Sequence, residues 1–218
     1  MKQIVRAVLF DLDGTLADTL ADLANATNAA LAAVGCPTHP RDKYRHLVGD
    51  GARTLCARAL PADRQELVDA VRERMREHYA AHCFDETKLY AGIPELITAL
   101  REQNYRLAVL SNKPDDFTQQ MVAHYFPDGT FQVVRGHVTG APLKPDPTAA
   151  VAIASQLGIP AREWLYLGDT NTDMQTATAA GMIPVGVLWG FREKAELLAS
   201  GAAKIVATPA EVLKLVDG

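Results

Sequence analysis

Short apolar runs, each followed by a cluster of polar residues, constrain this chain more than any other feature. The first run occupies residues 4–9, and the segment Phe10-Asp11-Leu12-Asp13-Gly14-Thr15-Leu16 follows it directly. Because side chains alternate along a strand, we expect Asp11 and Asp13 to point the same way, with Leu12 turned back into the core. Two carboxylates at a strand end, on a glycine turn, suit a hard divalent cation and acid–base chemistry. A strand followed by a capped helix is the structural alternative for the same residues.

From Gly92 onward the sequence alternates between helical and strand patterns. The pattern predicts strands at 105–110, 133–135, 164–167, 183–188 and 205–206, and helices at 94–103, 115–125, 147–157, 173–180, 192–200 and 209–216. Nearly continuous apolar strands that alternate with helices indicate a parallel sheet covered on both faces. The run at 4–9 is equally apolar, so it belongs to the same sheet. The predicted fold class is therefore α/β, with a Rossmann-like parallel sheet.

The segment from about residue 16 to residue 90 differs, because it shows helical patterns and no clear strand. A helix is predicted at 21–34, a helical run follows the break Gly49-Asp50-Gly51 within 47–60, and a strongly charged helical stretch occupies 63–82. We predict a core of residues 1–16 and 91–218 and an all-helical cap of residues 17–90, inserted after the first strand. Ligands of open α/β sheets bind outside the carboxyl ends of the strands, so this cap would cover Asp11 as a lid. Packing of these helices on one face of the sheet is the alternative.

Composition limits the class of protein and its partners. The chain has 218 residues, of which 48% are hydrophobic and 22% charged, as is typical of a soluble globular protein. Its net charge of −4 gives no reason to expect binding to nucleic acid or to acidic membranes. We find no signal-peptide pattern and no apolar run near the ~18 residues of a membrane span. The three cysteines are odd in number and lack metal-type spacing, so they are expected to be reduced in a cytoplasmic protein.

Three further polar clusters follow predicted strands or open a helix. They are Ser111-Asn112-Lys113, Lys144-Pro145-Asp146, and the segment from Gly168 to Asp173. Since parallel strands end at one edge of a sheet, we expect a set of side chains to converge there: Asp11, Asp13, Ser111, Lys144, Asp169 and Asp173. Taken singly, these residues could be a turn hydroxyl, a surface lysine and helix caps. Four such clusters at the same end of predicted elements favour a shared site.

The chemistry of this set is that of phosphoryl transfer. Asp11, Asp169 and Asp173 supply oxygen ligands for Mg²⁺. A phosphate needs neutralising donors, which Ser111, the backbone N–H groups after the first strand and the Lys144 ammonium supply. A carboxylate that attacks phosphorus gives an aspartyl-phosphate, and a second aspartate can protonate the leaving oxygen and then activate water.

These four clusters, in this order, closely resemble the four motifs of the haloacid dehalogenase superfamily, in its phosphatase branch, over the whole chain. The resemblance implies that Asp11 is the nucleophile and Asp13 the general acid and base, with the Asp13 backbone carbonyl also facing Mg²⁺. It implies that Lys144 stabilises charge and that Asp169 and Asp173 serve the metal.

The resemblance further implies that Ser111 and Asn112 hold the phosphoryl group, and the helical insertion resembles the α-helical cap type. Residues 47–52, 111–114 and 187–191 look most like phosphoglycolate phosphatases and their close relatives. The predicted activity is Mg²⁺-dependent hydrolysis of a small phosphorylated metabolite, with 2-phosphoglycolate the best guess. The amides of the loop at residues 49–51 and the Arg53 side chain are predicted to meet the carboxylate of such a substrate. We expect a monomer or a homodimer.

Other functions use similar residues. A phosphosugar mutase of the same superfamily would use Asp11 and Asp13 equally well. A pyrophosphatase is a further alternative, because residues 47–52, 111–114 and 187–191 resemble relatives that act on pyrophosphate as well. A dehalogenase fits less well, because a halide leaving group does not need protonation by Asp13. A non-catalytic phosphoryl-switch protein also combines aspartates, Mg²⁺ and lysine, but the helical insertion and Asp13 argue against that class.

Overall fold

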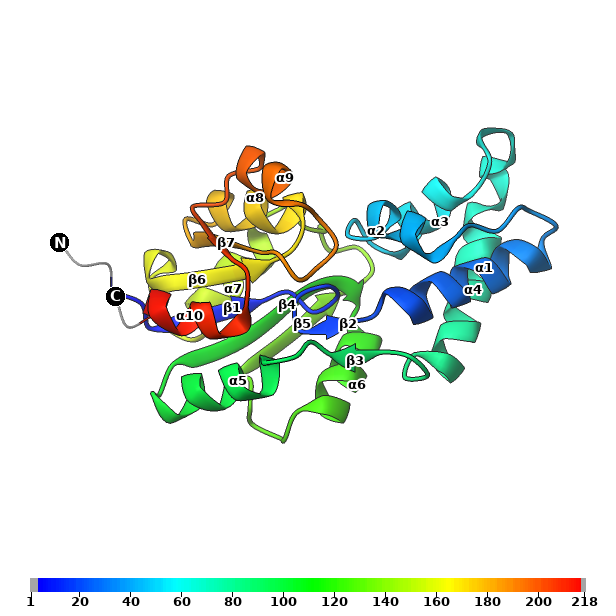
Figure 1. Cartoon of the computed structure of the whole chain (residues 1–218). Helices are drawn as coiled ribbons and strands as arrows, with labels where there is room; N and C mark the ends of the chain where they lie inside the picture. The colour runs from blue at the N-terminus through cyan, green and yellow to red at the C-terminus, as the bar shows by residue number, and fades with distance from the viewer. Residues whose placement is uncertain (1–3, 217–218) are drawn as a thin grey trace.

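The computed structural model describes residues 4–216 and is built around one six-stranded sheet. The strand order is β5-β4-β1-β6-β7-β8, and every neighbouring pair is parallel (Figure 1). The strands are β1 (Ala7–Phe10), β4 (Arg106–Pro114), β5 (Val133–His137), β6 (Trp164–Gly168), β7 (Ile183–Val187) and β8 (Lys204–Val206). Because β1 lies between β4 and β6, the polar residues that follow β1 and β6 meet those in the last part of β4 at one edge. The strand β4 continues through Ser111, Asn112 and Lys113, beyond the end predicted at residue 110. The predicted α/β class is confirmed.

Helices cover both faces of this sheet, and alternation along β1 decides which side chain meets which helices. Val8 and Phe10 belong to an apolar cluster with α5, α6 and α10, whereas Ala7 and Leu9 pack in a second cluster with α7 and α8. These helices are α5 (Ile93–Glu102), α6 (Asp115–Tyr125), α7 (Thr148–Gln156), α8 (Asn171–Ala179), α9 (Lys194–Ala199) and α10 (Pro209–Val216), with a 3-10 turn at Ala161–Glu163. None of the helices formed by residues 4–216 combines the length and the apolar character needed to cross a membrane.

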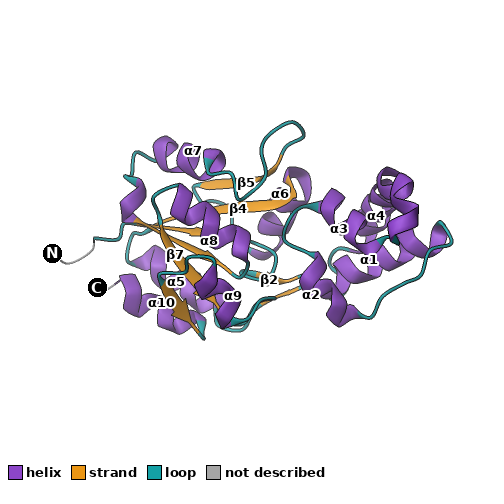
Figure 2. Ribbon diagram, turned by 90° about the horizontal axis from the view of Figure 1, so that it is seen from above, coloured by secondary structure: helices purple, strands orange, loops and turns teal. Residues whose placement is uncertain are grey.

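The remaining helices gather at one end of the molecule, beyond the edge of the sheet (Figures 1 and 2). They are α1 (Leu20–Ala33), α2 (Tyr44–Leu47), α3 (Ala52–Ala59) and α4 (Val68–His82), with 3-10 turns at Arg41–Lys43 and Ala62–Leu67. Leu31, Tyr44, Cys56 and Val71 are buried among them. We call α1 to α4 the cap helices. The division of the chain into two domains at residues 16 and 90 stays a prediction.

Two expectations for this segment were wrong. The sequence shows no strand there, yet β2 (Ala17–Asp18) and β3 (Lys88–Leu89) pair as an antiparallel ribbon where the chain leaves and re-enters the sheet region. Two-residue strands are too short to show alternation. The charged stretch 63–82 is also not one helix, because a 3-10 turn with a non-helical Arg64 precedes α4. A 3-10 turn nearly matches helical spacing, so the pattern does not separate the two.

Candidate active site

Three buried carboxylates form the centre of the site. Asp11 follows β1, Asp169 follows β6, and Asp173 lies in the first turn of α8. Each offers an oxygen atom within 4.8 Å of the other two, and their residues are 5%, 0% and 0% exposed. The sequence predicted that these residues would converge, and the parallel sheet brings them together because β1 and β6 are neighbours.

The charges of this cluster oppose one another. Burial, followed by repulsion from Asp173, raises the pKa of Asp11 to about 7, although Lys144 acts in the opposite direction. Burial, Asp173 and Asp11 raise the pKa of Asp169 well above its ordinary value. A divalent cation would remove this repulsion, and a set of carboxylate oxygens suits Mg²⁺. The residues at this edge therefore fit the metal that the sequence implied.

Lys144 supplies the positive charge at the centre. Its Nζ lies 3.0 Å from Asp11 Oδ1 and 2.7 Å from Asp173 Oδ1, and it also donates to the Leu110 carbonyl at 3.3 Å. Burial would lower the pKa of Lys144, but Asp11 and Asp173 outweigh it and hold that pKa well above its ordinary value. The predicted lysine thus stands as a fixed cation between two carboxylates and not as a surface residue.

Asp173 has both of its oxygens engaged by the protein. Oδ1 accepts from Lys144 and, at 3.4 Å, from the Tyr166 hydroxyl. Oδ2 accepts from the Thr170 backbone N–H at 3.0 Å and from the Thr170 hydroxyl at 2.7 Å. The first of these bonds, together with the Asp173 backbone N–H that donates to the Thr170 side chain, makes a capping box at the start of α8. Asp173 therefore orients Lys144 and fixes the helix that follows Asp169.

Asp169 is held in place by neighbours that sequence reasoning missed. Thr15 donates its hydroxyl to Oδ1 at 3.0 Å, and the Phe191 backbone N–H donates to Oδ2 at 2.8 Å. Gly14 and Gly190 leave room for it, since a Cβ on either would lie 2.3 Å from an Asp169 atom. Both glycines stand in motifs that the sequence singled out, but only the fold shows what they accommodate.

Asp13 points to a different partner. Lys113 Nζ lies 3.0 Å from Asp13 Oδ1, and the same Nζ donates to the Tyr79 hydroxyl at 2.8 Å. Tyr79 comes from cap helix α4, and its ring packs edge-on against Phe117. The Lys113 side chain is only 2% exposed. Neither Lys113 nor Tyr79 was predicted to act in the site, although Lys113 stands two positions after Ser111, as a strand residue on the same face would.

Ser111 and Asn112 differ in how many of their side-chain hydrogen-bonding groups are already occupied by the protein. The Ser111 Oγ accepts one long hydrogen bond, 3.3 Å from the Lys113 backbone N–H. Ser111 also lines the cavity between the cap helices and the sheet edge. The Asn112 carboxamide donates to the Gly49 and Lys144 carbonyls at 2.9 and 3.1 Å and accepts from the Lys144 backbone N–H at 2.8 Å. The carboxamide of Asn112 is therefore used to hold the Lys144 loop against the cap loop.

Two arginines also join the cap to the sheet edge. Arg192 donates to the Val48 carbonyl at 2.9 Å, and Arg45 donates to the Gly190 carbonyl at 3.0 Å. The bonds from Arg192 to Val48 and from Asn112 to Gly49 hold the loop before α3, and the bond from Arg45 attaches α2. The structure thus shows the cap helices in contact with the sheet edge.

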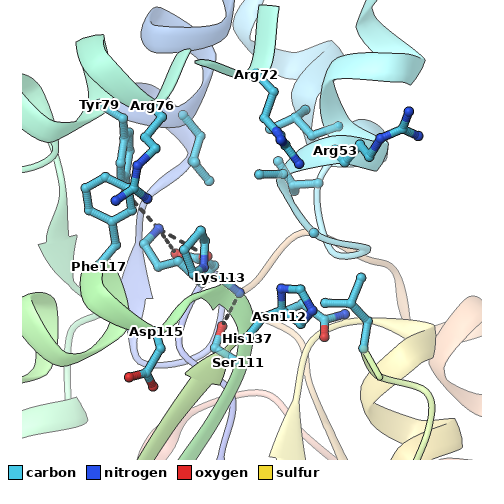
Figure 3. A pocket seen from close by; sticks show the side chains of 18 of the residues that line it. Arg53, Arg72, Arg76, Tyr79, Ser111, Asn112, Lys113, Asp115, Phe117 and His137 are labelled. Carbon is cyan, nitrogen blue, oxygen red and sulfur yellow. Dashed lines mark hydrogen bonds and ion pairs between the residues drawn. The ribbon is translucent and has the colours of Figure 1, made fainter. Parts of the chain in front are cut away.

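A cavity of about 570 Å³ lies between the cap helices and the sheet edge. Asp11, Asp13 and Ser111 line it from the sheet edge, and Arg53 and Arg72 line it from the cap. Figure 3 shows Ser111 below the cavity and both arginines above it. The Arg53 side chain is 63% exposed and pairs with Asp69 at 3.3 Å. Figure 3 shows its guanidinium directed away from Lys113, whereas Arg72 reaches down into the cavity.

Comparison with known proteins agrees with this geometry. Residues 8–187 match the family model described as haloacid dehalogenase-like hydrolase. The chain is 34% identical to a phosphoglycolate phosphatase of Pseudomonas putida, over 85% of this chain and 70% of that protein. It is also 34% identical to an N-acetylmuramic acid 6-phosphate phosphatase of Pseudomonas aeruginosa, over 98% and 95% of the two chains. The crystal structure of a proposed phosphoglycolate phosphatase from Lactobacillus delbrueckii subsp. bulgaricus superposes with a TM-score of 0.92 and 32% identity, covering 99% of both chains.

Proposed function

The chain belongs to the haloacid dehalogenase-like hydrolases and is a phosphatase of phosphate monoesters, and from this premise we propose that it hydrolyses a small acidic phosphate ester through an aspartyl-phosphate on Asp11. The observation that carries the proposal is the cluster of Asp11, Asp169 and Asp173 at the carboxyl ends of parallel strands, with Lys144 paired to Asp11 and Asp173. We also propose that residues 17–90 act as a cap over a core of residues 1–16 and 91–218.

The proposed reaction has two steps. A carboxylate oxygen of Asp11 attacks phosphorus, and the bond between phosphorus and the leaving oxygen breaks while Asp13 donates a proton to that oxygen. Asp13 then accepts a proton from the water that attacks the aspartyl-phosphate, which restores Asp11 and releases phosphate. Ser111 donates to a phosphoryl oxygen, and the Lys144 ammonium stabilises the charge that develops in the transition state.

Asp11, Asp169 and the backbone carbonyl of Asp13 would hold Mg²⁺, with Asp173 beside them. When bound, Mg²⁺ supplies positive charge that neutralises the carboxylates and the phosphate oxygens. The support for this assignment is the set of three buried carboxylates with a shared oxygen-lined centre.

Two substrates are favoured by specific observations. The relatives named phosphoglycolate phosphatase support 2-phosphoglycolate. A cavity of about 570 Å³ and a match that spans 95% of the Pseudomonas aeruginosa protein support N-acetylmuramic acid 6-phosphate as the second candidate. Both molecules are phosphate monoesters with a carboxylate.

An initial-rate panel with Mg²⁺ tests the proposal. It should contain 2-phosphoglycolate, N-acetylmuramic acid 6-phosphate, pyrophosphate, hexose phosphates and nucleoside monophosphates, with released phosphate as the readout. We expect the highest kcat/KM on an acidic monoester, no activity in EDTA, and weak support by Ca²⁺, which has a larger and looser coordination shell. An isomerised hexose phosphate without phosphate release would indicate a mutase, and the highest kcat/KM on pyrophosphate would indicate a pyrophosphatase.

Two variants test the covalent step. Asp11→Asn should remove the nucleophile and lower activity by several orders of magnitude. Asp13→Asn should cost roughly 10²–10⁴ in rate, because acid and base are lost together. Wild-type turnover in Asp11→Asn would contradict an aspartyl-phosphate at this residue.

A further inference from the structure

Arg53, Arg72 and Arg76 line the cavity from the cap side, and Figure 3 shows the Arg72 side chain of α4 extending into it. Arg72 lies in the second turn of α4, one turn before Arg76 and two turns before Tyr79. Its side chain is 47% exposed and borders open space. The question is what a guanidinium in this position would bind.

The neighbouring cationic side chains already form ion pairs with carboxylates of the protein. Arg76 forms an ion pair with Asp116 and stacks on the Phe117 ring at 5.0 Å. Lys113 is paired with Asp13. Arg53 pairs with Asp69 and is directed away from the cavity centre.

The ion pair of Arg72 is longer than those of these neighbours. Within residues 4–216, its one recorded ion pair is a 3.7 Å contact with Asp69 Oδ1, the oxygen that Arg53 approaches at 3.3 Å. Within this range, five acidic residues line the cavity, and four of them already have protein partners. Asp11 and Asp13 pair with lysines, Asp116 pairs with Arg76, and Asp115 accepts from the Gly136 backbone N–H at 2.7 Å. Glu73, next to Arg72 in α4, also lines the cavity. The Arg72 guanidinium therefore has donors to offer to a ligand.

The walls around Arg72 indicate what that ligand looks like. Leu55 of α3, Met75 of α4 and Leu143 line the same cavity and are apolar. A guanidinium presents paired N–H donors that match a carboxylate in a bidentate way. The cavity volume of about 570 Å³ lies within the ~300–1,000 Å³ of sites that take a drug-sized molecule. The space thus suits a leaving group that brings a carboxylate to Arg72 and packs its carbon atoms against these apolar side chains.

We propose that Arg72 binds the carboxylate of the leaving group and selects phosphorylated hydroxy acids or sugar acids over neutral phosphate esters. This inference rests on the proposed function, because it assigns the leaving-group half of the same site. It also transfers to Arg72 the role that the sequence suggested for Arg53.

Matched substrates with and without the carboxylate test this role. N-acetylmuramic acid 6-phosphate is compared with N-acetylglucosamine 6-phosphate, and 2-phosphoglycolate with 2-hydroxyethyl phosphate. In Arg72→Met we expect KM for the acidic member to rise about 10- to 100-fold, the size expected for loss of a charge-assisted pair, with kcat and the neutral member little changed. Arg72→Lys should restore part of the acidic preference. Arg74→Met is the control, because Arg74 lies in the same helix and does not line the cavity.

The outcomes separate this inference from the function on which it rests. A wild-type enzyme that releases phosphate but does not prefer acidic members would overturn the inference, as would an Arg72→Met variant that changes both members of each pair equally. A selective rise in KM in Arg53→Met, and none in Arg72→Met, would return the role to Arg53. A wild-type protein that hydrolyses no phosphate ester would overturn the proposed function itself.

Discussion

The ammonium group of Lys113 lies 3.0 Å from the Asp13 carboxylate and joins that residue to the cap through the Tyr79 hydroxyl. The Lys113 side chain is only 2% exposed and the Asp13 side chain 20%, so water solvates neither charge well and each charge neutralises the other. The group proposed as acid and base is thus fixed in part by a residue of α4. Contact between the cap and the sheet edge therefore bears directly on the orientation of Asp13.

We predict that Lys113→Met lowers kcat about 10- to 100-fold, because the Asp13 carboxylate loses a charged partner worth roughly 1.5–3 kcal/mol. Tyr79→Phe should have a smaller effect, since it keeps the ring on Phe117 and removes a neutral hydroxyl only. Steady-state kinetics of both variants, with circular dichroism to check folding, measure this. Equal losses in the two variants would show that Lys113 does not act through its charge.

The close approach of Gly14 to the Asp169 carboxylate can be tested by adding a Cβ atom at residue 14. This residue has φ +83°, and a Cβ on it would lie 2.3 Å from Asp169 Oδ2. Gly14→Ala should therefore displace the carboxylate and raise the Mg²⁺ concentration needed for half-maximal activity. Gly129→Ala is the matched control, because Gly129 has φ +76° and no atom within 4 Å of such a Cβ.

Both glycine variants should lose about 1 kcal/mol or more of unfolding free energy through left-handed strain. A change in Mg²⁺ dependence is expected in Gly14→Ala alone. The same Mg²⁺ dependence in the two variants would mean that the Asp169 carboxylate tolerates the displacement or does not hold the metal.

The carboxylate cluster should make stability depend on pH and on Mg²⁺ together. The pKa of Asp11 is about 7 in the folded chain against an ordinary 3.8. Between these values the folded state keeps a proton that the unfolded state has lost, so the contribution of Asp11 to the unfolding free energy falls as pH rises. Mg²⁺ needs the ionised form, and its stabilising effect should therefore grow over the same range.

We expect Mg²⁺ to raise the melting temperature more at about pH 8 than at about pH 5.5. Thermal melts of the wild type, with EDTA and with Mg²⁺, measure both values. Asp11→Asn is the control and should show a smaller Mg²⁺ effect with less dependence on pH. A wild-type shift of the same size at the two pH values would argue against metal binding by ionised Asp11.

The convergence of Asp11, Ser111, Lys144 and Asp169 could be predicted from local patterns. Apolar runs in a βα alternation specify parallel strands, and parallel strands end at one edge whatever their order in the sheet. The strand order that places β1 between β4 and β6 brings these residues next to one another, and the local patterns do not state that order.

The partners of individual side chains could not be predicted in the same way. Lys113 meets Tyr79, which lies 34 positions earlier, because of how α4 sits against β4. Arg53 and Arg72 both occupy helices, and each residue along a helix rotates the side chain by about 100°. Which arginine faces the cavity is therefore decided by the packing of α3 and α4, and no local pattern states it. The ribbon of β2 and β3 was not predicted for another reason: each strand has only two residues, which is too short to show an alternating pattern.

The last prediction concerns Ser111 and Asn112, which the resemblance to the superfamily gave the same role of holding the phosphoryl group. Their different hydrogen bonds in the structure predict different effects of substitution. The Ser111 hydroxyl has free hydrogen-bonding capacity in the cavity, so Ser111→Ala should chiefly raise KM for the phosphate ester. The Asn112 carboxamide is occupied by the Gly49 and Lys144 backbones. Asn112→Ala should therefore loosen the Lys144 loop and the cap contact, lowering kcat and the melting temperature.

Initial rates and thermal melts of the two variants separate these roles. We expect Ser111→Ala to melt close to the wild type, and Asn112→Ala to melt lower because buried backbone groups lose partners worth about 1–3 kcal/mol. Asn112→Asp is an additional probe, since it keeps the shape and the acceptor of the side chain but removes both donors. If Asn112→Ala raised KM without lowering kcat or the melting temperature, Asn112 would be holding the phosphoryl group itself, as the resemblance to the superfamily implied.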